Sequence, residues 1–480
     1  MLSHPAQDKH GSVTKYTSPT LAAVLTTVLA TSATSTAAAT AVPASASTHA
    51  HDQLDGVWRT DGYSTIVRIT GGTYELYDTT AISCIRDTTS DGDGSVSTFT
   101  PGPGPDQARW HIDANVNHRT LTRLPALPAA CTQAAPATPI ETFDVFWRTF
   151  AENYPFFAQR GIDWKHVYDT YRPQVTATTT DAQLRDIFAA MITPLHDAHV
   201  GLIADGVRVF SARPGTQVPN DDLDAQTVAL IKHADLAGAT SPLQTWCQGR
   251  VGFATLPGNV GYLRVAGFTG FTSDDTFAAN AAAFSSALDA VFTADRTTGP
   301  NRLRGLVLDV RINGGGDDPL GLMLASRLTG NSFFAYAKQT RDDPADPERY
   351  TRPQPFVVHP SAAPHYTGPI SILAGGSTFS AGESVTQALL NRSPRPVLVG
   401  ENTQGVFSDI LDRQLPNGWM FGLPDEEYLT PSGRTYDIAG IPPDVTVPTL
   451  TPEQFADGTD PAFQVALRTL GRRWSPPTPS

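Results

Sequence analysis

Three short segments contain the residue types that can activate a hydroxyl group for attack on a carbonyl. The first spans residues 375–390 and reads GGSTFSAGESVTQALL, a Gly-Gly turn followed by a helical pattern that begins directly after Ser380. The first N–H groups of a helix lack internal partners, so those from Ala381 onward point at whatever the exposed side chain attacks. Ser380 is therefore a candidate nucleophile, although the commonest role for Ser377, Thr378 or Ser380 at this place is a helix N-cap.

The second segment supplies glycines at the end of a predicted strand. Residues 305–318 read GLVLDVRINGGGDD, an apolar run followed by three consecutive glycines. In open α/β sheets ligands bind at the carboxyl ends of strands, and glycine there offers accessible N–H groups for an oxyanion hole. A structural tight turn is the alternative. A phosphate-binding loop is not indicated, because Asp317 and Asp318 would repel a phosphate and no Gly-Lys-Ser/Thr follows.

The third segment contains two histidines. Residues 194–202 read PLHDAHVGL, with His196 and His199 three positions apart. A hydroxyl nucleophile needs a base whose pKa lies near the working pH, and histidine meets this need. A buried structural histidine is the alternative. No third ligand follows at a recognisable spacing, so we expect no metal and no cofactor.

The nucleophile and glycine segments each follow a predicted strand of an α/β region at residues 251–450. Its near-continuous apolar strands alternate with helical stretches, which is typical of a sheet covered on both faces. The predicted strands are 260–268, 305–312, 369–375 and 396–401, and the predicted helices are 275–293, 319–329 and 382–391.

Other regions flank this α/β core. Short alternating runs at 47–135 predict a β-rich N-terminal domain that ends in a Pro/Ala-rich linker. Residues 140–202 change to a helical period and predict a small helical region that carries the histidine motif. We expect residues 203–250 to be a connector and residues 451–480 a frayed C-terminal tail.

The first 46 residues have the order of a secretory signal. An apolar run at 21–30 is followed by small residues, with Ala44-Ser45-Ala46 as a plausible cleavage site. The run is shorter than the ~20 residues needed to span a bilayer. We therefore expect a secreted or extracytoplasmic protein without stable membrane association.

Composition, charge and cysteine usage narrow the possibilities further. The 480 residues include 39 Gly and 39 Pro and are 17% charged, which excludes a long coiled coil. The formal net charge of −13 offers no basic stripe for a phosphate backbone, so no nucleic-acid partner is expected. Cys84 and Cys131 lie in the same N-terminal region and are expected to pair, which leaves Cys247 free.

Five motifs in a fixed order resemble one enzyme family. They read HDAHVGL, LVLDVRINGGG, TFSAGE, VGENTQG at 399–405 and YDIAGIPPDVTV at 436–447. Over roughly residues 140–450 the chain resembles the tricorn-core and C-terminal processing serine peptidases, also called tail-specific proteases. The resemblance implies a crotonase-like α/β core and a serine-type peptidase acting on a peptide or unfolded protein.

The resemblance also assigns roles at the nucleophile. Ser380 occupies the position of the family nucleophile. The backbone N–H groups of Gly315, Gly316 and Ala381 would form the oxyanion hole. The alternative of an α/β-hydrolase is not indicated, because Thr378 stands where a nucleophile elbow needs glycine.

The base and the acid follow from the two branches of the family. One branch activates serine with a lysine about two dozen residues downstream, and the other uses a distant histidine held by an acid. No lysine occurs from 381 to 480, and Val406 stands where the lysine would be, so His199 is the expected base. Asp437 occupies the position of the orienting acid, where the family usually has glutamate.

Nearby polar residues are expected to be structural. Glu383 lies in the first helical turn after Ser380, where the helix dipole favours a negative charge, and Glu401 is a second, weaker candidate acid. We expect Asp309, Arg311 and Asn313 to fix the glycine turn by hydrogen bonds.

Two further expectations concern function. About 48 residues separate HVGL from the core, which is too few for the PDZ domain that some relatives insert there. The alternative function is a non-catalytic protein of the same fold that binds a hydrophobic ligand or peptide. Asp437, and Ala198 where tricorn-like relatives can have serine, keep that alternative open; an ester or thioester hydrolase would differ only in substrate.

Overall fold

The computed structural model describes residues 53–88 and 96–473. The predicted secretory signal at 1–46 lies outside the described residues. Within them, no helix combines the length and the apolar character that crossing a membrane requires.

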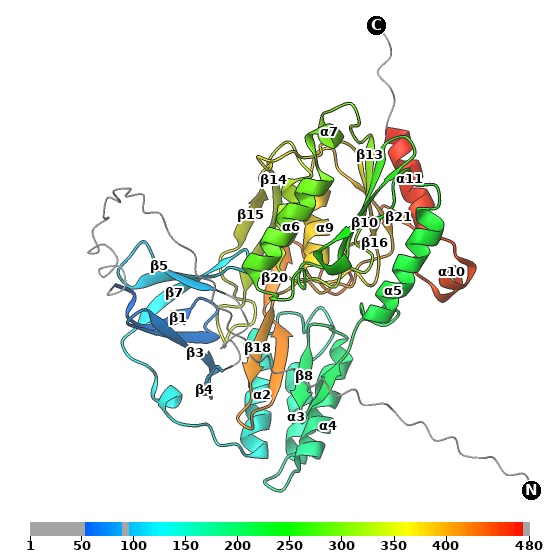
Figure 1. The fold of residues 1–480 in the computed structure, drawn as a ribbon. Helices are drawn as coiled ribbons and strands as arrows, with labels where there is room; N and C mark the ends of the chain where they lie inside the picture. Colours follow the sequence, from blue (N-terminus) through cyan, green and yellow to red (C-terminus); the bar gives the residue numbers. More distant parts are fainter. Residues whose placement is uncertain (1–52, 89–95, 474–480) are drawn as a thin grey trace, which may run out of the picture. The chain divides into compact units, whose positions relative to one another are not determined.

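Alternating apolar and polar residues build an N-terminal antiparallel sheet with the strand order β4-β3-β2-β1-β7-β6-β5 (Figure 1). The strands are β1 (Gly56–Thr60), β2 (Thr65–Thr70), β3 (Thr73–Thr79), β4 (Cys84–Arg86), β5 (Ser97–Pro101), β6 (Gln107–Ile112) and β7 (His118–Leu124). Trp58, Val67 and Leu121 are buried together on one face of this sheet. Cys84 and Cys131 form a disulfide and Cys247 is a free, buried thiol, so the predicted pairing is confirmed.

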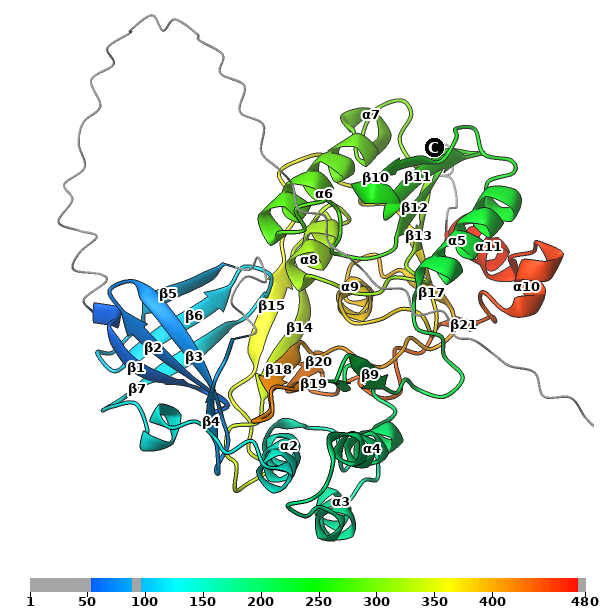
Figure 2. The same cartoon turned by 60° about the horizontal axis from the view of Figure 1, so that its bottom comes forward.

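Three helices form the region that carries the histidine motif. They are α2 (Pro139–Asn153), α3 (Trp164–Tyr171) and α4 (Asp181–Ile192), and Thr138 and Thr180 cap the first and last. They lie beside a four-stranded sheet with the order β18-β19-β8-β9 (Figure 2), made of β8 (Gly201–Ala204), β9 (Val207–Phe210), β18 (Ile410–Gln414) and β19 (Met420–Pro424). Phe146 and Phe150 of α2 contact Phe421 of β19 and close this core.

The α/β core contains a seven-stranded sheet with the order β10-β11-β12-β13-β16-β17-β21, parallel from β12 onward. Its strands are β10 (Gln244–Trp246), β11 (Val251–Leu256), β12 (Val260–Val265), β13 (Gly305–Asp309), β16 (Ile370–Ala374), β17 (Val397–Gly400) and β21 (Val445–Thr446). The α/β pattern expected for this region is therefore present.

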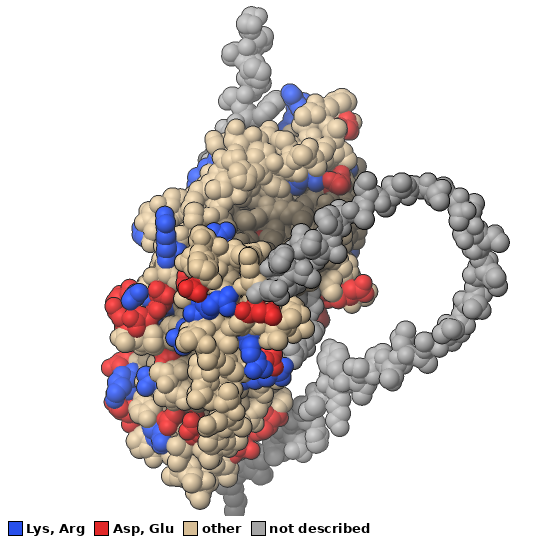
Figure 3. All heavy atoms as spheres, turned by 90° about the vertical axis from the view of Figure 1, so that its left-hand side faces the viewer, with Lys and Arg blue, Asp and Glu red and all other residues tan. Residues whose placement is uncertain are grey.

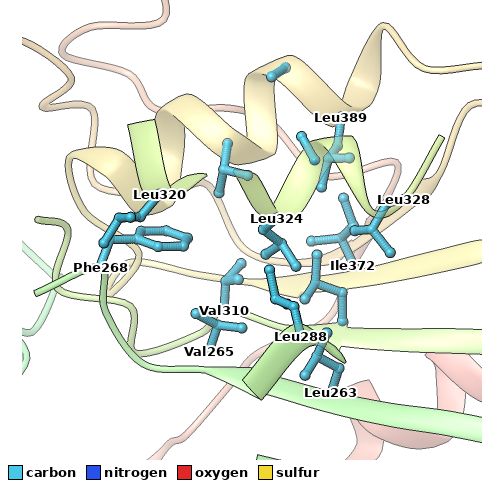
Figure 4. Close-up of a cluster of buried hydrophobic side chains, with 14 of the residues drawn as sticks. Leu263, Val265, Phe268, Leu288, Val310, Leu320, Leu324, Leu328, Ile372 and Leu389 are labelled. Carbon is cyan, nitrogen blue, oxygen red and sulfur yellow. The ribbon is translucent and has the colours of Figure 1, made fainter. Parts of the chain in front are cut away.

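Both faces of this sheet are covered, as the apolar strands predict. Leu306 and Leu308 point toward α6 (Phe277–Val291), α8 (Asp318–Ser326) and α9 (Ala381–Leu390), whereas Val307 points to the opposite face. Figure 4 shows the first of these two cores, in which leucines of α8 and α9 pack on β12, β13 and β16.

The remaining elements connect or flank these units. A three-stranded sheet has the order β15-β14-β20, made of β14 (Phe333–Thr340), β15 (Gln354–Val358) and β20 (Glu426–Leu429). The connector at 203–250 contains α5 (Asp221–Leu230) and a π-helix (Ile231–Asp235). Short helices elsewhere are η1 (Ala129–Thr132), η2 (Arg172–Gln174), η3 (Thr193–Leu195), η5 (Cys247–Gly249) and α7 (Ala294–Thr297).

The prediction of a frayed tail was wrong for residues 452–473. This stretch forms α10 (Pro452–Asp457) and α11 (Pro461–Arg473), and α11 covers the second face of the core sheet. Phe463 is buried there against Tyr262, with ring centroids 5.9 Å apart. Composition pointed to fraying because the Pro-rich last residues masked the apolar stripe of α11.

Candidate active site

Ser380 stands at a strained turn between β16 and α9. Its φ of +50° lies in the left-handed region, and its N–H donates to the carbonyl oxygen of Val406 at 3.0 Å. Its side chain makes no capping hydrogen bond to α9. The hydroxyl of Ser377 donates to the Gln217 carbonyl and that of Thr378 to the Val310 carbonyl, so the N-cap alternative is wrong. The Ser380 hydroxyl is free of the helix.

Gly315 lies directly against the Ser380 side chain. A Cβ added at Gly315 would stand 2.5 Å from the Ser380 Cβ and 3.0 Å from its Oγ. The φ of Gly315 is +87° and that of Gly316 is +118°, conformations that favour glycine. Only a residue without a side chain fits beside the hydroxyl in this geometry.

The three predicted oxyanion donors differ in their partners. The Gly315 N–H donates to the Asn313 Oδ1 at 2.9 Å, while the Asn313 Nδ2 donates to the Val265 carbonyl at 3.0 Å. Among the described residues, the N–H groups of Gly316 and Ala381 donate to no protein acceptor. Ala381 and Gly316 thus keep the unpaired N–H groups that an oxyanion hole requires, within the part of the chain that the structure describes, and Asn313 holds the turn in place as expected.

His199 comes just before β8 and is buried, with 9% of its surface exposed. Its backbone N–H donates to the Asp197 Oδ1 at 3.0 Å, and the other oxygen of Asp197 accepts from Tyr154 and Arg160. Burial lowers the pKa of His199, while Asp197, Asp409 and the Ser408 backbone oppose this. The ring is therefore neutral at neutral pH and can accept a proton.

The two histidines of the motif have different surroundings. The Nδ1 of His199 is buried and has no hydrogen-bond partner among the described residues. His196 is exposed at the surface, where its Nδ1 lies 3.2 Å from the Ser211 hydroxyl. Only His199 points into the protein.

Asp437 lies in the same interior but is not hydrogen-bonded to His199. Its Oδ1 accepts from the Phe407 N–H at 3.1 Å, and its Oδ2 accepts from the Thr435 hydroxyl. Burial raises the pKa of Asp437 to about 8, although both hydrogen bonds lower it. The carboxyl group is mostly protonated at neutral pH.

Residues Val406–Asp409, which we call the bridging segment, interact with Ser380, His199 and Asp437. The Val406 carbonyl accepts from Ser380, the Phe407 N–H donates to Asp437, and the Ser408 backbone interacts with the His199 ring. Sequence reasoning missed this segment because its backbone groups make these bonds, and backbone groups leave no side-chain signature.

Glu383 has a structural role, as expected, but for a different reason. Its fully buried carboxylate accepts from the N–H groups of Gly405 and Val406 at 2.7 and 2.8 Å. Burial raises the pKa of Glu383 to about 7. Glu383 therefore holds the loop in which the carbonyl oxygen of Val406 accepts from the Ser380 N–H. Glu401 instead accepts from the N–H and the hydroxyl of Thr449.

The expectation for Arg311 and Asp309 needs correction. The Arg311 guanidinium is buried and bonds to Asp309 and to Asp460 at the start of α11. These two residues therefore join β13 to the C-terminal helix, whereas the glycine turn is held by Asn313 and by backbone bonds to Ala266 and Phe268.

Comparison with known proteins identifies similar sequences. Residues 259–447 match the model of peptidase family S41, and residues 136–193 match that of the tricorn protease C1 domain. The chloroplastic C-terminal processing peptidase of Tetradesmus obliquus is 30% identical over 211 residues. That match covers 42% of this chain and 39% of the length of the curated relative.

Solved structures share the fold. A candidate peptidase from Parabacteroides merdae has a TM-score of 0.57 and 24% identity, covering 69% of this chain and 96% of its own. Mature CPAF has a TM-score of 0.51 and 12% identity, covering 70% of this chain and 98% of its own. These similarities support an α/β peptidase fold.

Proposed function

Because this chain belongs to peptidase family S41, the family of the tail-specific proteases, we propose that it hydrolyses peptide bonds through an acyl-enzyme on Ser380. One observation carries the proposal. The Ser380 hydroxyl is free of the helix, lies against Gly315, and stands beside the N–H of Ala381, which has no acceptor in the described part of the chain. A structural serine needs none of these three features.

The reaction we propose uses His199 as the general base. His199 takes the proton from the Ser380 hydroxyl as its oxygen attacks the peptide carbonyl. The N–H groups of Ala381 and Gly316 stabilise the oxyanion, and Gly315 adds a third once its N–H leaves Asn313. Protonated His199 then gives its proton to the leaving amine, and water hydrolyses the acyl-enzyme.

Asp437 is proposed as the acid that stabilises protonated His199. A positive charge on a nearby ring favours the ionised form of a carboxyl group. The carboxyl of Asp437 and the Ser408 backbone, which interacts with the ring, belong to one network through Phe407. Charge on His199 and ionisation of Asp437 therefore favour each other.

The wider setting is proposed as follows. The core is crotonase-like, with a β-rich domain at 47–135, a helical region at 140–202, and a connector without a PDZ domain at 203–250. The chain is exported and acts on peptides or unfolded proteins, without nucleic-acid or membrane partners. On the face drawn in Figure 3, basic and acidic side chains lie intermixed, which supports the absence of a nucleic-acid partner.

Labelling with a fluorophosphonate probe and cleavage of denatured casein test the proposal. Ser380→Ala should abolish both and leave the melting curve nearly unchanged, because the side chain makes no hydrogen bond to the helix. Ser377→Ala is the matched control from the same turn and should keep both activities. Full labelling of Ser380→Ala would refute the proposal.

The alternative of a non-catalytic binding protein is favoured by one observation. Asp437 bonds to Phe407 and Thr435 and not to His199, whose Nδ1 has no partner in residues 53–88 and 96–473. If the wild-type chain binds peptides tightly but is neither labelled nor able to cleave casein, this alternative replaces the peptidase.

A further inference from the structure

We propose that the N-terminal sheet positions the catalytic residues, through a buried connection from Asn117 to Lys338 and Asp409. This inference rests on the proposed peptidase function. Neither family model covers residues 53–130, so the family assigns this region no role. The role comes from the contacts that the region makes.

Asn117 lies in the turn between β6 and β7, at the end of these strands that contacts the core. It is buried, with 8% of its surface exposed. Its Nδ2 donates to the Glu426 Oε1 at 2.7 Å, and its Oδ1 accepts from the Lys338 Nζ at 3.4 Å. The neighbouring Val116 packs against the main core cluster. This turn therefore penetrates the core instead of resting on its surface.

Lys338 on β14 connects this turn to the bridging segment. Its Nζ donates to the Asp409 Oδ2 at 2.7 Å and pairs with the Glu426 Oε2 at 2.6 Å, and its side chain is 2% exposed. Burial lowers the pKa of Lys338, but Asp409 and Glu426 raise it above its ordinary value, so the ammonium stays charged. A buried charge of this kind needs all of its partners in place.

Asp409 is the last residue of the bridging segment. The Ser408 hydroxyl donates to the Asp409 carbonyl at 2.6 Å, and the Ser408 backbone interacts with the His199 ring. The Asp409 carboxylate itself raises the pKa of His199. A shift of Lys338 would therefore move the Asp409 carboxylate, which favours the protonated form of His199, and Asn117 is a positioning residue.

The surrounding seam makes Asn117 hard to replace. A cavity of 630 Å³ opens beside the turn, and it is lined by residues of the N-terminal sheet and of β14 and β15. Its lining includes His118, Arg119 and Arg352 as well as Lys338. On the side of Lys338 that faces the N-terminal sheet, the cavity interrupts the packing, and the hydrogen bond to Asn117 is the contact that holds the ammonium group there.

A double-mutant cycle in the full chain tests the inference. Asn117→Ala, Asp409→Asn and the double variant are compared by kcat and KM on fluorescein-labelled denatured casein. We expect each single variant to lower kcat about tenfold with KM within about twofold, a range known for partners that orient catalytic ligands. The double variant should be no slower than the slower single variant, because both changes break one connection.

The control breaks another buried contact across the same seam. Asp78 of β3 pairs with Arg413 of β18 at 2.7 Å, and it touches no residue of the bridging segment. Asp78→Asn should lower the melting temperature and leave kcat within about twofold of the wild type. A merely structural role of the sheet predicts equal losses of kcat for Asp78→Asn and Asn117→Ala.

Three results would overturn the inference while the peptidase function stands. They are an unchanged kcat for Asn117→Ala, multiplicative effects in the double variant, or an equal loss in Asp78→Asn. Should Asn117→Ala fail to fold, Asn117→Ser keeps a polar group in the turn and gives the same comparison. If the wild-type chain neither cleaves casein nor reacts with the probe, the proposed function fails and this role falls with it.

Discussion

Gly315→Ala is the sharpest test of the geometry at the nucleophile. The new Cβ would lie 2.5 Å from the Ser380 Cβ, whereas ordinary contact begins at 3.4 Å. One of the two side chains must therefore move by about 1 Å. Gly315 is anchored by Asn313 and Phe268, so Ser380 is the group that is displaced.

The expected magnitude separates into two parts. Alanine at the φ of +87° costs about 1–2 kcal/mol of stability for its backbone conformation. A displacement of about 1 Å at the reacting group costs about 10²-fold in rate, or about 2.7 kcal/mol. Gly315→Ala should therefore lose stability slightly and activity severely.

Gly418 provides a matched control for the backbone cost. Its φ is +86°, and a Cβ there would meet nothing within 4 Å. Gly418→Ala should also lose about 1–2 kcal/mol of stability, but it should keep wild-type activity. Stability is measured by chemical denaturation, and activity by the rate of fluorophosphonate labelling. Labelling of Gly315→Ala at the wild-type rate would refute the proposed position of Ser380.

Four further predictions concern Glu383, His199, Asp437 and Phe463. Glu383→Gln leaves one backbone N–H without an acceptor, so we expect the free energy of unfolding, measured by denaturation, to fall by about 1–3 kcal/mol. We also expect a lower kcat on casein, and an unchanged kcat would contradict the role of Glu383. Burial lowers the pKa of His199, so kcat/KM should rise with pH at a midpoint below 6.5, its ordinary value, because the neutral ring is the base. Burial raises the pKa of Asp437 to about 8, so kcat/KM of the wild type should rise a second time near that pH. This second rise should disappear in Asp437→Asn, and its absence from the wild-type profile would contradict the role of Asp437. Phe463 is buried, so Phe463→Ala should lower the free energy of unfolding by about 3–5 kcal/mol. Gln464 is exposed, so Gln464→Ala should leave it unchanged, and equal effects of the two variants in denaturation would contradict the packing of α11.

Local pattern predicted the elements and the order of the candidate residues. Strands β12, β13, β16 and β17 coincide with apolar runs because a parallel strand buried on both faces must be apolar throughout. The turn before α9 was predictable because glycines and a new helical period meet at Ser380. Its free hydroxyl was not, since an N-cap has the same local pattern.

The partners of each polar group were decided only by the tertiary structure. The bond from Ser380 to Val406 and the contact from Asn117 to Lys338 join residues that are 26 and 221 positions apart. Glu383 bonds to a loop 22 positions away instead of its own helix.

By itself, the sequence determined the strands and helices of the α/β core around Ser380 and which side chains are able to do chemistry, because neighbouring residues set both. It did not determine which carbonyl, carboxylate or ammonium group meets each of them. Backbone groups are the same at every position, so only the packing of distant segments selects among them.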